Sequence, residues 1–333
     1  MRLITVGLTP HRQEFLVPTW ELMRCHEVII LEEPPDPYFP KVIKGEISIE
    51  TYLEKIESGF PEYTRLNLEF LQKLYKEGKS ICQVEPYLER WLIIREMLDS
   101  GVPREEVEKI RELSEVYQSE HETFGKLLDY YAAMQGPFDS LVQKIKDFAR
   151  ADAKRLALRD KMRAKEIISL IRRLPNKTIY VEAGYIHLKL IYYLAKVKKN
   201  LFCLKVENLL LKALKARGFN GVLPSPGDGL TSYYLFGGKH RNISEDLLAA
   251  RSIVYIKLIE KEELSPTPEE PFPHLKNELF WRLFVWQLSY EECKTLDKFI
   301  RLLTTQKARE MAQRLFPDAY KKAASRLADK VAL

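Results

Sequence analysis

The chain has 333 residues, of which 46% are hydrophobic and 30% charged, a globular composition that is sufficient for a sizeable core and excludes a disordered chain. The formal net charge of +6, from 53 basic and 47 acidic residues, is small and scattered, so it does not by itself call for a nucleic-acid partner. No run approaches the roughly 18 uninterrupted apolar residues of a membrane span.

The cysteine pattern and the amino-terminal sequence favour a cytoplasmic protein. The four cysteines lie far apart and form no CxxC pair, which is typical of reduced thiols. The first residues, MRLITVGLTPH, are too short an apolar run for a signal peptide. The many charged residues, together with few Asn and Gln, are a compositional hint of a thermophile protein.

Five short apolar runs predict strands, and helical periodicity follows most of them. The predicted strands are 3–7, 27–33, 80–86, 178–184 and 201–207. Runs rich in Val and Ile that lack polar alternation favour a parallel sheet that is covered on both faces. Because these strands alternate with helices, the predicted fold is α/β with flanking helices.

A long helical stretch separates the third predicted strand from the fourth. Apolar residues at three- and four-residue spacing predict two long helices over 103–174, broken at Gly136-Pro137, that form a helical hairpin. A Pro-rich segment that begins at 264 predicts a linker, and helices follow it. We therefore expect an α/β domain over 1–263 that carries this hairpin, and a helical C-terminal extension over 264–333.

Ionisable side chains recur where the predicted strands end. They are His11 after the first strand, Glu32 and Glu33 at the second, Glu85 at the third, and Glu182 and His187 at the fourth. The carboxyl ends of parallel strands share one edge, where α/β proteins bind ligands, so these residues are predicted to lie together. Any one of these residues alone would be interpreted as structural, but the recurrence of ionisable side chains at the ends of four strands predicts a functional site.

Two kinds of chemistry fit this set of side chains. Crowded carboxylates repel one another unless a cation or a proton lies among them. Mixed imidazole and carboxylate ligands suit Zn²⁺, Mn²⁺, Fe²⁺ or Co²⁺, and a divalent ion with an open position would activate water. The predicted metal ligands are His11, His187 and Glu182. Without a metal, a histidine–glutamate pair could act as general base and orienter.

Five segments form an ordered set of short motifs. They are VGLTPHRQEF (6–15), VIILEE (28–33), CQVEP (82–86), LRDKMRAKEIISLI (158–171) and YVEAGYIHL (180–188). In this order they resemble the motifs of the erythromycin esterase, ChaN-like and TraB/Tiki superfamily, which include a glycine followed by a histidine, an RDxxM helix and a GxxH motif. The resemblance covers about residues 1–207. One departure is Leu8, which stands where the esterases carry a glutamate.

The resemblance implies a fold and the place of a site. Members of the superfamily are linked to hydrolysis of a macrolide ester, to metal-dependent peptide cleavage and to haem binding. Matched motif by motif, it carries over His11, Glu32, Glu85, Arg159 and His187. Arg159 lies near the apolar stripe of its helix, and an inward arginine could hold a substrate carboxylate or stabilise an oxyanion.

The predicted function is metal-assisted hydrolysis of an ester or amide (peptide) bond in a small molecule or a peptide, with Glu32, Glu85 and Arg159 as catalytic residues. One alternative is a non-catalytic protein that binds haem or a metal at the same edge. Another is an interaction protein that docks through the apolar helix ELFWRLFVWQL (278–288), although such spacing is more often core than interface. The docking alternative predicts an oligomer, such as a homodimer, that chelators leave unchanged.

Overall fold

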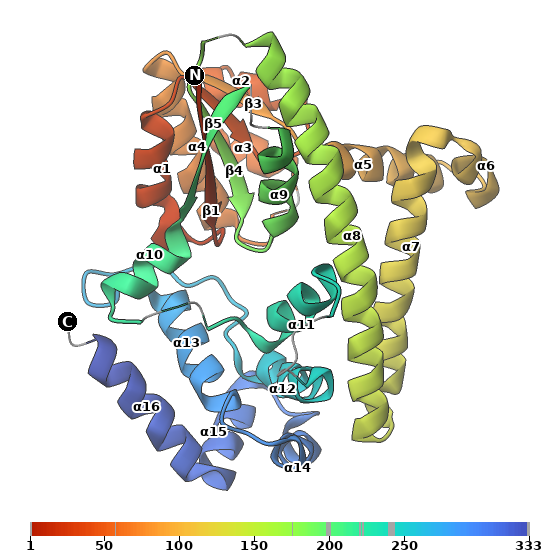
Figure 1. Ribbon diagram of the computed structural model, residues 1–333, viewed down its shortest axis with the longest axis vertical. Helices are drawn as coiled ribbons and strands as arrows, with labels where there is room; N and C mark the ends of the chain where they lie inside the picture. The colour runs from red at the N-terminus through yellow and green to blue at the C-terminus, as the bar shows by residue number, and fades with distance from the viewer. Residues whose placement is uncertain are drawn as a thin grey trace. The chain divides into compact units, whose positions relative to one another are not determined.

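The computed structural model describes residues 2–56, 58–174, 176–197, 201–219, 221, 223–238 and 244–331 (Figure 1). The chain divides into two compact units, and neither of them is continuous in sequence. The first consists of 1–118 and 156–212, and the second of 119–155 and 213–333. This division differs from the predicted boundary at 263–264. The segment predicted as a linker lies inside the second unit, where the Leu264 amide donates to His274 Nε2 at 2.8 Å.

A five-stranded parallel sheet forms the centre of the first unit. Its strands are β1 (Arg2–Thr9), β2 (Val28–Leu31), β3 (Ser80–Gln83), β4 (Ile179–Gly184) and β5 (Phe202–Asn208). They are arranged in the order β3-β2-β4-β1-β5, and every neighbouring pair is parallel. The α/β fold and all five predicted strands are confirmed. The strand ends differ from the predicted ends by a few residues at most.

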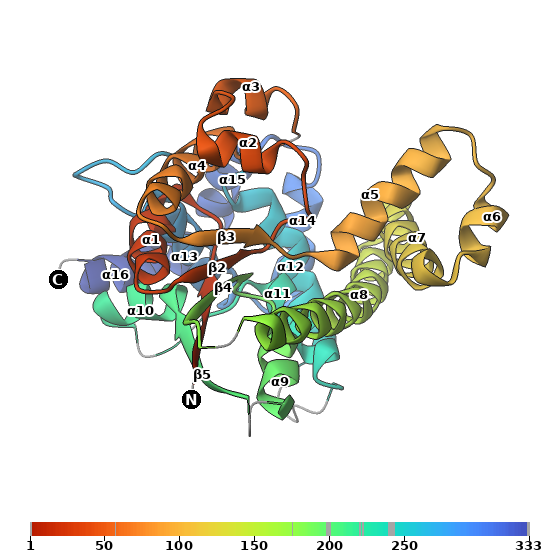
Figure 2. The same cartoon turned by 90° about the horizontal axis from the view of Figure 1, so that it is seen from above.

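Helices cover both faces of the sheet. Those confined to the first unit are α1 (Leu16–Arg24), α2 (Phe39–Lys44), α3 (Ile49–Leu53), α4 (Pro61–Lys76), α5 (Pro86–Asp99), α6 (Arg104–Lys109) and α9 (Leu188–Val197), with a 3-10 turn at Gln13–Phe15. Ile4, Val6 and Val181 pack against α8 and α9, whereas Ile29 and Tyr180 pack on the opposite face against α1 to α4 (Figures 1 and 2). Successive residues of each strand thus pack on opposite faces, and helices cover both faces. The strands therefore show no alternation of apolar and polar residues.

Three helices run through both units: α7 (Arg111–Ala132), α8 (Phe138–Arg173) and α10 (Leu209–Ala216), and a 3-10 turn at Ala133–Gln135 lies between the first two. The predicted break at Gly136-Pro137 is confirmed. A second break, at Ile110, separates α6 from α7, because the backbone of Ile110 is extended. The apolar period of α7 does not mark one continuous core face, since Phe124, Leu128 and Tyr131 are more than half exposed.

The rest of the second unit is helical. Its helices are α11 (Pro226–Leu235), α12 (Glu245–Leu258), α13 (Pro273–Val285), α14 (Tyr290–Ile300), α15 (Thr305–Leu315) and α16 (Pro317–Val331). The apolar helix considered as a docking face is α13, but Leu279, Trp281, Phe284 and Val285 are buried. These side chains form core and are not available to a partner. Among the described residues, no helix is both long and apolar enough to cross a membrane.

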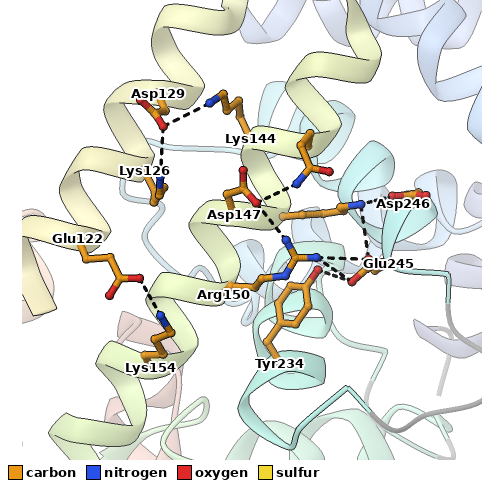
Figure 3. Close-up of polar contacts among 12 residues, drawn as sticks. Glu122, Lys126, Asp129, Lys144, Asp147, Arg150, Lys154, Tyr234, Glu245 and Asp246 are labelled. Atoms are coloured by element: carbon orange, nitrogen blue, oxygen red, sulfur yellow. Dashed lines mark hydrogen bonds and ion pairs between the residues drawn. The ribbon is translucent and has the colours of Figure 1, made fainter.

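Charged side chains connect α8 to α11 and α12 within the second unit (Figure 3). Arg150 Nη2 lies 3.3 Å from Glu245, which also accepts the Tyr234 hydroxyl. Lys146 donates to Asp246 at 2.6 Å. Because these groups share partners, they form a network, the arrangement in which surface ion pairs contribute most to stability.

Candidate active site

The parallel sheet brings the carboxyl ends of β1 to β4 together. Gly7 of β1 pairs with Glu182 of β4, and Thr9 pairs with Gly184, so His11 lies just beyond this level. A β-carbon on Gly184 would lie 3.3 Å from His187 Cδ2, 3.7 Å from Glu32 Oε2 and 3.9 Å from His11 Cε1. Both imidazoles and one carboxylate therefore surround Gly184.

His187 is held between two carboxylates. Its Nδ1 lies 2.5 Å from Asp160 Oδ1, and its Nε2 lies 2.7 Å from Glu32 Oε1. Asp160 and Glu32 also accept backbone amides, from Leu190 at 2.9 Å and from Gly184 at 2.6 Å, as ionised carboxylates do. Since a carboxylate only accepts, both ring nitrogens must donate, and the ring is an imidazolium.

The charges around His187 agree with this assignment. Burial would lower the pKa of His187, but the Glu32 and Asp160 carboxylates outweigh it and raise the pKa to about 9. Burial also opposes ionisation of Glu32, but His187 and Arg163 hold the pKa of Glu32 well below its usual range. His187 is therefore a fixed cation at neutral pH, and neither ring nitrogen has a lone pair to offer.

Two arginines of α8 reach the same edge, one turn apart. Arg159 Nη2 lies 3.2 Å from Glu85 Oε2 and 3.5 Å from Glu32 Oε1. Arg163, which is fully buried, donates to the carbonyl oxygens of Val84 at 2.9 Å and Glu182 at 2.7 Å. Because Val84 directly follows β3 and Glu182 belongs to β4, Arg163 ties the strand ends together, whereas Arg159 remains partly accessible.

His11 is the accessible imidazole of the site. Its side chain is 38% exposed, and its Nε2 lies 4.0 Å from Glu182 Oε1. Glu182 is buried and accepts the Glu32 amide through its other oxygen at 3.2 Å. A partly exposed imidazole beside a fixed carboxylate is the arrangement in which histidine exchanges protons with a bound molecule.

Acidic and phenolic groups continue the site on the α4 side of the sheet. Burial and the Glu182 carboxylate raise the pKa of Glu33 to about 6. Burial, followed by Glu182, raises the pKa values of Tyr63 and Tyr180 well above the usual value, so both phenols stay protonated. The Tyr63 ring lies 6.1 Å from the His11 ring.

Unsatisfied polar atoms gather at this edge. Among the described residues, His11 Nε2, Glu85 Oε1 and the Tyr180 hydroxyl are buried without a hydrogen-bond partner. Buried polar groups in native proteins nearly always have a partner, so three at one edge indicate a place for water or a ligand. The site therefore combines fixed charges with open hydrogen-bonding positions.

All six predicted site residues, His11, Glu32, Glu85, Arg159, Glu182 and His187, lie at this edge. Within the described ranges, however, no three His, Cys, Asp or Glu side chains are arranged to hold a metal ion. Both ring nitrogens of His187 already face carboxylates, Asp160 and Glu32, and the two arginines already pair with Glu32 and Glu85. The donors as placed therefore do not fit a resident divalent ion.

Asp160, Arg163, Tyr63 and Tyr180 were not among the predicted site residues. Arg163 could have been found, because it follows Arg159 by four residues and shares its helix face. Tyr180 precedes Glu182 by two and so shares its strand face. Nothing in the sequence marks Tyr63, which α4 brings from a distant segment.

Gly7, the last residue of the first predicted strand, lies inside β1, which continues to Thr9. A β-carbon there would lie 2.1 Å from the Tyr180 hydroxyl oxygen and 2.5 Å from its Cζ. Gly7→Ala should therefore lower the free energy of unfolding by about 3 kcal/mol, because the buried ring cannot move aside. Gly125→Ala is the control, since nothing lies near that position. Denaturant unfolding that shows less than about 0.5 kcal/mol lost at Gly7 would contradict this packing.

Comparisons with known proteins give one informative result. No family model matches the chain, and no solved structure matches it. An uncharacterized protein of the archaeon Archaeoglobus fulgidus is 32% identical over 276 residues, which cover 81% of this chain and 89% of that protein. The likeness extends over most of both chains. The chain therefore belongs to the same family as this uncharacterized archaeal protein.

Proposed function

We propose that the chain hydrolyses an ester or amide bond in a small molecule or a peptide, with His11 as general base and Glu182 as its orienting partner. The observation that carries the proposal is a partly exposed imidazole that lies 4.0 Å from a buried carboxylate, at the edge where α/β proteins bind ligands. The fixed positive charges of Arg159, Arg163 and His187 lie at the same edge.

In the proposed reaction, His11 takes a proton from a water molecule as the water oxygen attacks the carbonyl carbon. The Glu182 carboxylate stabilises the imidazolium that forms. When the tetrahedral intermediate collapses, the bond to the leaving oxygen or nitrogen breaks, and His11 returns the proton to that atom. The products are a carboxylic acid and an alcohol or an amine.

Arg159 supplies the electrostatic part of the proposal. Its guanidinium is partly accessible, and it is held by Glu85 and Glu32. A donor that is already oriented stabilises the negative charge that develops on the carbonyl oxygen, and it needs no reorganisation during the reaction. Glu32 and Glu85, predicted as catalytic residues, would act here by positioning Arg159.

The metal-assisted form of this reaction, and a haem- or metal-binding role without turnover, stay predictions. We favour the acid–base route because the donors at the edge are paired with one another. A panel of p-nitrophenyl esters and fluorogenic peptides tests the proposal, together with elemental analysis and an absorbance scan of protein purified without added metal. We expect hydrolysis that survives EDTA. Activity that EDTA abolishes and one metal restores would establish the metal-assisted form, and a stoichiometric Soret band would establish haem binding.

A further inference from the structure

The carboxylates of the site differ in the cations that face them. Glu32 and Glu85 face Arg159 and Arg163, and Asp160 faces His187. Among the described residues, no lysine or arginine forms an ion pair with Glu33 or Glu182. The nearest basic group is the His11 imidazole, 4.0 Å from Glu182. Glu33 and Glu182 are close enough for the charge of Glu182 to raise the pKa of Glu33, and neither forms an ion pair with a lysine or arginine among the described residues.

Tyr180 adds an independent observation at this place. Its side chain is fully buried, and within the described part of the chain its hydroxyl has no hydrogen-bond partner. The backbone of Tyr180 pairs with Thr5, but its ring extends along the sheet so that the hydroxyl lies beside Gly7. Because Gly7 pairs with Glu182, the hydroxyl is at the level of Glu182. Tyr180 and Glu182 alternate to the same face of β4, so the open hydroxyl points along that face toward the carboxyl edge.

We propose that Glu33, Glu182 and the Tyr180 hydroxyl form a subsite for a primary ammonium group of the substrate. An ammonium has three N–H donors, and these groups offer it three acceptors. Its charge would relieve the repulsion between the two carboxylates. The substrate would then be an ester or amide that carries a free amine close to the bond that is cleaved. This inference rests on the proposed hydrolysis.

Two arguments favour an ammonium over a metal ion at this place. Phenol hydroxyls are neutral here and donate or accept hydrogen bonds, which suits an N–H group better than a divalent ion that seeks charged or imidazole ligands. The Gln83 amide already donates to Glu33 Oε2 at 2.9 Å, which fixes that carboxylate and leaves its other oxygen to accept. A metal ion remains an outcome of the test.

The kinetic test compares two esters that differ in one ammonium group, the p-nitrophenyl esters of glycine and of acetic acid. After correction for the uncatalysed rates, we expect kcat/KM to be at least about tenfold higher for the glycine ester, the difference a charged hydrogen bond makes. Glu33→Gln and Tyr180→Phe should each reduce this preference, because each should lower kcat/KM more for the glycine ester than for the acetate ester. Glu54→Gln is the matched control, because Glu54 is exposed and the change in charge is the same.

A binding measurement separates the subsite from the proposed hydrolysis. Benzylamine should raise the melting temperature of the wild type but not of Glu33→Gln, whereas benzyl alcohol should raise neither. If no ester is cleaved and benzylamine still binds through Glu33, the hydrolysis proposal fails and the subsite stands. If both esters are cleaved with equal corrected kcat/KM and Glu33→Gln changes neither, the subsite is wrong. Stabilisation by MnCl₂ or ZnCl₂ that depends on Glu33 would also overturn it.

Discussion

Replacing His187 by alanine is expected to lower the free energy of unfolding by about 3–5 kcal/mol at pH 7. The variant leaves the buried carboxylates of Asp160 and Glu32 without their common cation, and breaking a buried pair from one side costs about this much. Denaturant unfolding measures the loss. His121→Ala, at an exposed position of α7, should change the stability by less than about 0.5 kcal/mol.

The loss at His187 should also depend on pH. The folded pKa is raised to about 9, whereas the unfolded value is the ordinary one of about 6.5. The stabilisation is therefore fully present below about pH 6.5 and disappears as the pH rises through about 9, a change of about 3 kcal/mol. We expect the stability difference between the wild type and His187→Ala to shrink over this interval. A difference that grows toward pH 9 would mean that the ring is neutral in the folded protein.

Replacing His11 by glutamine is expected to reduce kcat/KM for any cleaved ester or peptide by about 10²- to 10⁴-fold, the usual contribution of a general base. The fold should persist, because the His11 side chain is 38% exposed and ties no strand ends together. The measurement combines steady-state kinetics with thermal unfolding of the same sample. His121→Gln should have wild-type kinetics.

The outcome at His11 is informative in both directions. If His11→Gln keeps more than about a tenth of wild-type kcat/KM and unfolds normally, His11 is not the general base of the reaction. A large loss of activity accompanied by a large loss of stability would instead give His11 a structural role, which its exposure contradicts.

The sheet was predictable because its strands carry a local signal. Runs such as 178–184 are apolar on both faces, which is typical of strands in a parallel sheet that is covered on both sides. The helical period of α7 was equally visible, but period alone does not say whether a face is covered, and Phe124 and Leu128 are exposed. Nor does it show that residues 119–155 belong to a different unit from the residues around them.

The convergence of these side chains at one edge was also predictable, whereas their partners there were not. Parallel strands must bring His11, Glu182 and His187 to one edge, whatever the helices do. The partners of His187 depend on the path of α8. This helix supplies Asp160 as a second carboxylate beside His187, in addition to Glu32. That addition changes the chemistry, because carboxylates on both sides of an imidazole favour its charged form.

In the proposed reaction the two histidines have separate roles, in which His187 is a fixed cation and His11 performs the proton transfer. Nitrogen-15 NMR of the histidine side chains at pH 7, with each ring assigned through its backbone, tests these roles without a substrate. We predict that both ring nitrogens of His187 carry protons at pH 7 and remain protonated until the pH approaches about 9. A spectrum in which His187 is a single neutral tautomer at pH 7 would contradict the account.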